Sequence, residues 1–143
     1  MTMFATCPGP PHETKDARIP RALVFAALIA LLGYEITRTI GGFQRIRALI
    51  VRRGKAKNLE SRGDPVRIVC LAVAKACSLY PRTVKCLQRS SVIVYLLRMY
   101  GVKADLVFGV ERFPFYAHAW VEVEGRIVND RKVKAIYQTI GRI

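Results

Sequence analysis

The sequence predicts an α+β fold, in which N-terminal helices precede a small antiparallel sheet. The hydrophobic pattern has helical periodicity as far as residue 100, and after Gly101 it changes to an alternation with a period of two. The chain has 143 residues, 52% of them hydrophobic and 24% charged, which suits one globular domain. We therefore expect a single domain over residues 21–143, helical over 21–100 and with its sheet over 103–130.

Residues 1–20 are rich in proline and polar residues and have no apolar periodicity, so we expect a disordered tail there. The next segment, Ala22–Tyr34, is a run of 13 apolar or small residues. A helix that spans a bilayer needs about 20 such residues, so a buried or interfacial helix is the better interpretation. The run also begins too far along the chain for a secretory signal peptide.

A second helix, basic and amphipathic, is predicted over residues 42–57. Its apolar residues Phe43, Ile46, Leu49 and Ile50 share one face, and arginine and lysine occupy most of the remaining surface. A surface helix with solvated charges is the simplest interpretation. Binding to an acidic partner or to an anionic membrane surface is the alternative.

The net charge of +14 favours acidic partners, which include peptides, proteins, membrane surfaces and nucleic acids. Nucleic acid is disfavoured, because the basic helix lacks interleaved aromatic residues and the sequence has no recognised binding motif. The four cysteines form no CxxC pair and have no histidine spaced as a fellow ligand. We therefore predict no metal site, no cofactor and no disulfide scaffold, and a reducing, cytoplasmic compartment.

Asp64 and Pro65 mark the start of another helix, with Asp64 as the N-cap and Pro65 as the first helical residue. The apolar pattern extends this helix to Tyr80. Cys70 and Cys77 lie on it seven residues apart, hence on one face, and are predicted to be small core residues.

The following helix is predicted over residues 86–100, with Thr83 as its N-cap and Gly101 as its C-cap. This assignment puts Cys86 at the third helical position, inside the first turn. The partial positive charge of a helix N-terminus favours a thiolate, and Lys85 adds further positive charge. Cys86 is therefore the candidate nucleophile.

Three strands are predicted after this helix, over residues 103–111, 115–123 and 126–130. The last segment, 131–143, fits either another strand or a basic tail. In the second strand, His118 alternates with small apolar residues that suit a packed face, so its imidazole is predicted to point away from that face.

The turn between the last two predicted strands sets the partner of His118. Gly125 suits the left-handed position of a three-residue loop, which pairs Glu122 with Arg126. Counting outward from that pair puts Asp130 opposite His118, where an acid can hold one imidazole nitrogen and leave the other for a thiol. Glu122 is the alternative acid.

A cysteine at a helix start, a histidine on a strand and an acid on the next strand form the layout expected of papain-like and transglutaminase-like cores. The predicted chemistry is attack by the Cys86 thiolate on a peptide carbonyl, with His118 as the general acid and base. The Cys86 backbone N–H is a candidate oxyanion donor, and the sequence identifies no second one.

Residues 85–130 resemble the bacterial lasso-peptide leader peptidases, a transglutaminase-like family of cysteine peptidases. The resemblance is carried by C-L-x-R-S, by L-L-R followed by Gly101, by A-H-A-W-V-E and by V-N-D. It implies a peptidase of the stand-alone protease type that removes the leader from a ribosomally made precursor. In that family's pattern Cys86 matches the nucleophile, His118 the general base and Asp130 the orienting acid.

The resemblance also implies partners: a precursor peptide with leader and core, a separate leader-recognition protein and, as a further candidate, an ATP-dependent macrolactam synthetase. The separate protein is implied because residues 1–63 lack the strand pattern of the winged-helix recognition domain that some family members carry. Two alternatives stay open. One is acyl transfer to an amine by the same Cys86, His118 and Asp130, as in transglutaminases and N-acyltransferases. The other is a non-catalytic basic module that binds a membrane surface.

Overall fold

The computed structural model describes residues 19–51, 64–113, 115–130 and 137–143. These residues form helices first and an antiparallel sheet afterwards, so the predicted α+β order is confirmed. The helices are α1 (Arg21–Val51), α2 (Pro65–Leu79) and α3 (Cys86–Met99), and the strands are β1 (Ala104–Glu111), β2 (Tyr116–Val123), β3 (Arg126–Ile127) and β4 (Gln138–Arg142).

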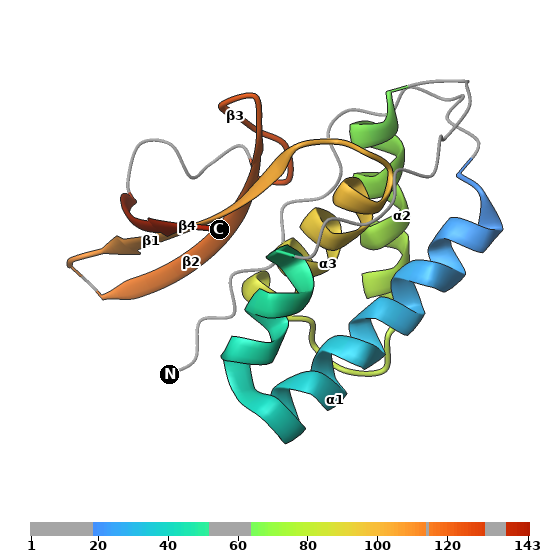
Figure 1. Cartoon of the computed structure of the whole chain (residues 1–143), viewed down its shortest axis with the longest axis horizontal. Helices are drawn as coiled ribbons and strands as arrows, with labels where there is room; N and C mark the ends of the chain where they lie inside the picture. Colours follow the sequence, from blue (N-terminus) through green and yellow to red (C-terminus); the bar gives the residue numbers. More distant parts are fainter. Residues whose placement is uncertain (1–18, 52–63, 114, 131–136) are drawn as a thin grey trace.

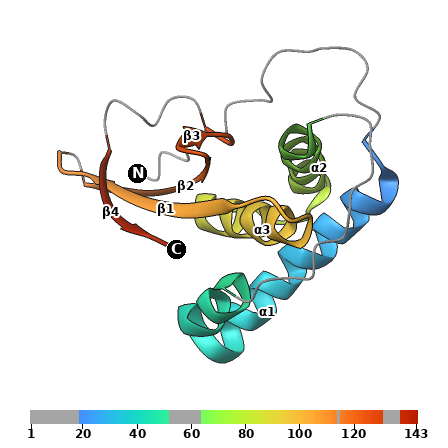
Figure 2. The ribbon, with the colours of Figure 1, turned by 45° about the horizontal axis from the view of Figure 1, so that its top comes forward.

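Helix α3 lies between the sheet and the pair formed by α1 and α2, as both views of the ribbon show (Figures 1 and 2). The strand order in the sheet is β3-β2-β1-β4. The predicted meander of three strands is therefore present, and the ambiguous segment 131–143 contributes β4 beside β1. The predicted tail falls outside the described residues, except for Ile19 and Pro20.

Helix α1 covers both the apolar run and the first part of the predicted basic helix. Gly42 departs from helical geometry, with φ 62° and ψ −169°, so the predicted break between two helices is a kink within one element. Residues 52–57 of the predicted basic helix lie outside the described residues. Ile46 and Ile50 are buried, but the other two residues of the predicted apolar face remain exposed.

The outward face of α1 is unusually apolar. Its most apolar window of 18 residues has a mean hydropathy of 1.7 and is 17% buried, so α1 is long and apolar enough to cross a membrane by length and composition. A core helix, or a signal sequence near an N-terminus, passes the same test. The exposed apolar residues of this face recur at helical spacing: Phe25, Ile29, Leu32, Ile36 and Ile40.

The predicted cap of α2 is confirmed. The Asp64 carboxylate accepts a hydrogen bond of 3.0 Å from the Val66 N–H, and Pro65 is the first helical residue. This cap satisfies one of the backbone donors that a helix start leaves free.

The predicted N-cap of α3 is wrong by two residues. Lys85, not Thr83, is the N-cap, because its backbone is extended and its carbonyl accepts the hydrogen bond of 3.0 Å from the Arg89 N–H. Cys86 is consequently the first helical residue rather than the third. It still lies in the first turn, so the electrostatic argument for a thiolate holds. At the other end Gly101 has φ 77°, as a left-handed C-cap requires.

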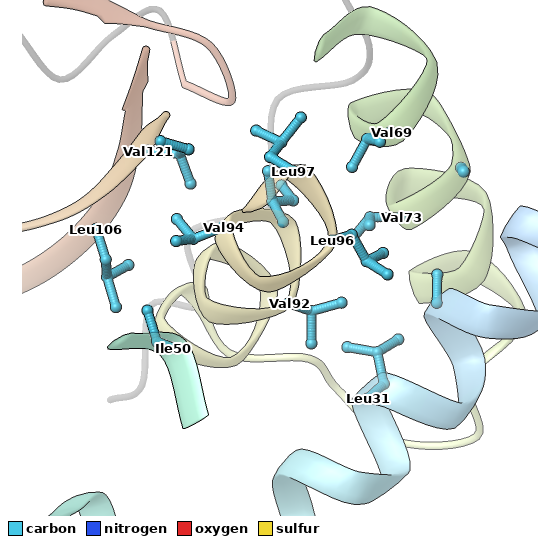
Figure 3. Packing of buried hydrophobic residues seen from close by; sticks show 14 of the residues in the cluster. Leu31, Ile50, Val69, Val73, Val92, Val94, Leu96, Leu97, Leu106 and Val121 are labelled. Atoms are coloured by element: carbon cyan, nitrogen blue, oxygen red, sulfur yellow. The ribbon is translucent and has the colours of Figure 1, made fainter. Parts of the chain in front are cut away.

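The core forms around α3, whose apolar side chains point to both neighbouring layers. Figure 3 shows Val94 directed at the sheet and Leu96 directed at α2. The same cluster includes Leu106 and Val121 from the sheet and Val73 from α2. A smaller cluster contains buried Val107 and Trp120, with Ile127 and Tyr137 packed against them.

The β2–β3 hairpin closes through a two-residue turn, Glu124-Gly125, rather than the predicted three-residue loop. Both residues have positive φ, 50° and 73°, a pattern whose twist matches that of the flanking strands. Glu122 therefore pairs with Ile127 and not with Arg126. The predicted register was wrong by one residue.

Candidate active site

Cys86, His118 and Asp130 come together where the first turn of α3 meets β2. Cys86 starts α3, His118 lies within β2, and Asp130 follows β3. β3 ends at Ile127, not at residue 130 as predicted, so it pairs only with the turn end of β2. The remaining edge of β2 is available to side chains from α3 and from residues 128–130.

The His118 Nε2 atom lies 2.9 Å from the Asp130 Oδ2 atom. Both side chains are largely buried, with 18% and 15% of their surfaces exposed. The contact does not follow from the ladder, because the observed register continued outward would put Arg131 opposite His118. Instead the chain bends at Val128 and Asn129, and this bend brings Asp130 back to the imidazole.

Hydrogen bonds favour a thiolate at Cys86. Burial alone raises the pKa of the Cys86 thiol, but hydrogen bonds with the His118 side chain and with the backbone N–H groups of Ala119 and Leu87 outweigh it. The net pKa of Cys86 lies below its ordinary value. A thiolate is the nucleophilic form of cysteine, so this environment suits covalent chemistry.

The environment of His118 shifts its pKa in the complementary direction. The hydrogen bond with Cys86 raises the pKa of His118, burial lowers it, and the hydrogen bond with Asp130 raises it again, with a net rise. A lowered cysteine pKa beside a raised histidine pKa favours a thiolate–imidazolium pair. Since Asp130 occupies Nε2, Nδ1 is the ring nitrogen left for the thiol.

Two aromatic rings flank His118. The Trp120 ring stacks against it with centroids 6.3 Å apart, and the Tyr137 ring lies 5.4 Å from it. The position of Tyr137 was not predicted, because it depends on the pairing of β4 with β1. Strand-like residues in the segment 131–143 were the only signal for it.

Glu122, the alternative acid, has other partners. Its carboxylate accepts a hydrogen bond of 3.0 Å from the Trp120 Nε1–H and one of 2.8 Å from Arg142. Asp130, not Glu122, is therefore the carboxylate that contacts His118.

Cys70 and Cys77 are partly buried and pack against the main core, as their prediction as core residues implies. Burial raises the pKa of the Cys70 thiol to about 11, so it stays protonated at neutral pH. Its Sγ atom lies 3.9 Å from the Val128 carbonyl oxygen as a weak donor. Within the described parts of the chain, no three histidine, cysteine or acidic side chains group so that they could hold a metal ion.

Comparison with known proteins gives a family and one informative relative. The transglutaminase-like superfamily matches residues 19–142 of the chain. The microcin J25-processing protein McjB of Escherichia coli is 44% identical over 45 residues, which cover 32% of this chain and 22% of that protein. The match thus spans less than a quarter of the relative's length. No solved structure gives a significant match.

Proposed function

Because the chain belongs to the transglutaminase-like superfamily, we propose that it is a cysteine peptidase that removes the leader from a ribosomally synthesised lasso-peptide precursor. The observation that carries this proposal is the chain of contacts from the Cys86 thiol to His118 and on to Asp130. The similarity to a protein named for processing microcin J25 supports a peptide substrate. The resemblance of residues 85–130 to leader peptidases supports the same class.

In the proposed reaction the Cys86 thiolate attacks the carbonyl carbon of the scissile peptide, and a carbon–sulfur bond forms. His118 gives its proton to the leaving amine as the carbon–nitrogen bond breaks, which releases one fragment and leaves an acyl-enzyme. His118 then takes a proton from a water molecule, whose oxygen attacks the acyl carbon and expels the thiolate. Asp130 orients the ring and stabilises its charged form.

The start of α3 also suits the negative charge that develops on the substrate carbonyl oxygen. Cys86 is the first helical residue, so its backbone N–H has no acceptor within the helix. We propose this N–H as one oxyanion donor, with the positive end of the helix dipole adding to its effect.

We further propose that a separate leader-recognition protein presents the precursor, and that an ATP-dependent macrolactam synthetase acts on the released core. The resemblance of residues 85–130 to stand-alone leader peptidases supports these partners. The net charge of +14 would assist the capture of an acidic peptide or partner.

Mass spectrometry of a cognate precursor, incubated with the leader-recognition protein and the full chain, tests the activity. We expect one cut at the leader–core junction with the wild type and with Cys70→Ala, and none with Cys86→Ala. Cleavage that survives Cys86→Ala would contradict the proposal and favour a non-catalytic role for this chain. A leader-side product whose new C-terminal carbonyl carries an added amine instead of water would favour acyl transfer.

For the location of the enzyme, we propose that the outward face of α1 rests on an anionic membrane surface. The exposed apolar stripe from Phe25 to Ile40 suits insertion among acyl chains, and the charge of +14 suits anionic headgroups. Co-sedimentation with phosphatidylglycerol vesicles tests this, and we expect the double change Ile29→Asp and Ile36→Asp to abolish binding. Ser78→Asp on exposed α2 adds a negative charge away from the stripe and should bind like wild type. Binding to the leader-recognition protein, but not to vesicles, would reassign the stripe to that protein.

A further inference from the structure

Ser90 and Asn129 form a polar bridge between α3 and the segment that follows β3. The Asn129 Nδ2–H donates to the Ser90 Oγ over 2.9 Å, and the Ser90 hydroxyl donates to the Ala119 carbonyl over 2.9 Å. The Val121 N–H donates to the Asn129 Oδ1 over 2.8 Å. Ser90 is 1% exposed, so its hydroxyl lies in the core with both its donor and acceptor functions in use.

The bridge occupies the edge of β2 that β3 does not reach. In an extended strand the N–H and C=O of one residue point to the same side, and at Ala119 that side faces α3. The Ala119 N–H donates to the Cys86 sulfur, while its C=O accepts from Ser90. Cys86 and Ser90 are one helical turn apart and therefore lie on the same side of α3. Together they bind both the N–H and the C=O of Ala119.

Each member of this arrangement lies next to one residue of the proposed catalytic set. The pairs are Ser90 with Cys86 one turn earlier, Ala119 with His118, and Asn129 with Asp130. The bridge thereby ties together three segments that are far apart in the sequence. The β2–β3 ladder cannot do this, because it ends before the site is reached.

We propose that Ser90 and Asn129 are positioning residues, which hold the first turn of α3, the edge of β2 and the bend after β3 in the geometry that keeps the Cys86 sulfur in contact with His118. The inference explains two polar residues of the C-L-x-R-S and V-N-D motifs that the proposed chemistry leaves without a role. Its consequence for turnover rests on the proposed peptidase function. Its consequence for the Cys86 thiol does not, because thiol reactivity is measured without substrate.

The test is the pH dependence of Cys86 alkylation by iodoacetamide, followed by peptide mass spectrometry in the full chain. We expect Ser90→Ala and Asn129→Ala to slow alkylation of Cys86 at pH 7 by about tenfold, because loss of the contact with His118 leaves less of the thiol as thiolate. The midpoint of the profile should move to higher pH. Ser91→Ala is the matched control, because Ser91 is 2% exposed on the same helix and its hydroxyl has no hydrogen-bond partner among the residues that the structure describes.

If Ser90 and Asn129 only stabilise the fold, their variants will unfold more easily, but the alkylation profile of the folded protein will not change. That result would overturn the proposal. Asn129 is only partly buried, so Asn129→Ala keeps the test decisive if Ser90→Ala does not fold. With a cognate precursor, both bridge variants should lose at least tenfold in kcat with little change in KM. A wild-type chain that cleaves no precursor would end the peptidase proposal, while the alkylation profiles would still decide the positioning role.

Discussion

The His118 Nε2 and the Asp130 Oδ2 lie 2.9 Å apart, although the register of the β2–β3 hairpin does not place these residues opposite each other. The chain bends at Val128 and Asn129, and this bend moves Asp130 next to the His118 ring. Contacts from α3 and from the Asn129 side chain, rather than a regular ladder, therefore determine where the carboxylate sits.

Replacing Asp130 with asparagine should reduce cleavage strongly and leave the fold intact. The change removes the carboxylate that raises the pKa of His118 and that stabilises the imidazolium. In a comparable serine protease triad the loss in kcat is about 10⁴-fold, and we expect roughly 10²- to 10⁴-fold here. The rate of leader cleavage measures the effect.

Glu122→Gln is the control for Asp130→Asn, because it neutralises a carboxylate on the same strand that contacts Trp120 and Arg142 rather than His118. We expect its rate to stay within a few-fold of wild type. If the two variants lose the same fraction of the cleavage rate, Asp130 does not have the proposed role.

Cys86 should be the fastest cysteine to alkylate at neutral pH. Its pKa lies below the ordinary value, so its alkylation rate, which follows the thiolate fraction, rises at lower pH than the rate of an ordinary cysteine. Cys70 serves as an internal reference, because its pKa of about 11 keeps it protonated over the same range. His118→Ala removes the hydrogen bond that lowers the Cys86 pKa and should move the Cys86 profile to higher pH. A Cys86 profile that is unaltered by His118→Ala would contradict the pairing.

The sequence predicted those parts of the fold that depend on local patterns. Helix periodicity, the Asp64-Pro65 start and the Gly101 stop each depend on residues within one or two turns, and the structure agrees with them. The same patterns placed Cys86 at a helix start and His118 on a strand. That the two belong to one site was predicted from the resemblance of this order to a transglutaminase-like layout, not from any local pattern.

Features that depend on unusual backbone or on long-range pairing were not predictable. Glu124 adopts φ 50°, which a non-glycine residue rarely does, so the sequence pointed to Gly125 alone and to a longer loop. The predicted register was wrong by one residue, but Asp130 still contacts His118. The bend after β3, which was not predicted, brings it there. Tyr137 beside His118 depends on β4, whose partner β1 is distant in the sequence.

Arg98, the arginine of the L-L-R motif, should be important for stability. Its guanidinium donates to the backbone carbonyls of Ala104, Ile50 and Ile143, over 2.9, 2.6 and 3.1 Å. It thus joins the start of β1, the end of α1 and the residue after β4. We expect Arg98→Met to lower the free energy of unfolding by about 2–3 kcal/mol, because it leaves three acceptors without this donor.

Urea denaturation followed by circular dichroism measures the effect of Arg98→Met. Arg82→Met is the control, because the Arg82 side chain is 75% exposed and its only ion pair in the described structure, with Glu35, is 4.0 Å long. An exposed pair of this kind contributes at most about 1 kcal/mol. If the two variants unfold at the same urea concentration, the guanidinium contacts do not stabilise the fold.

Gly109 should not tolerate even a methyl group, because a Cβ atom there would lie 2.5 Å from the buried Trp120 ring and 3.0 Å from the Tyr137 Cβ. Gly109 pairs with His118 across β1 and β2, so a displaced Trp120 would also disturb the rings around the proposed base. We expect Gly109→Ala to destabilise the fold by about 1–3 kcal/mol and to alter the near-ultraviolet circular dichroism of the single tryptophan. Gly33→Ala in α1 is the opposite case, since its Cβ would meet nothing within 4 Å, and it should stabilise the helix by about 0.5–1 kcal/mol. If Gly109→Ala shifts the urea unfolding curve in the same stabilising direction as Gly33→Ala, close packing against Trp120 is not what requires glycine at position 109.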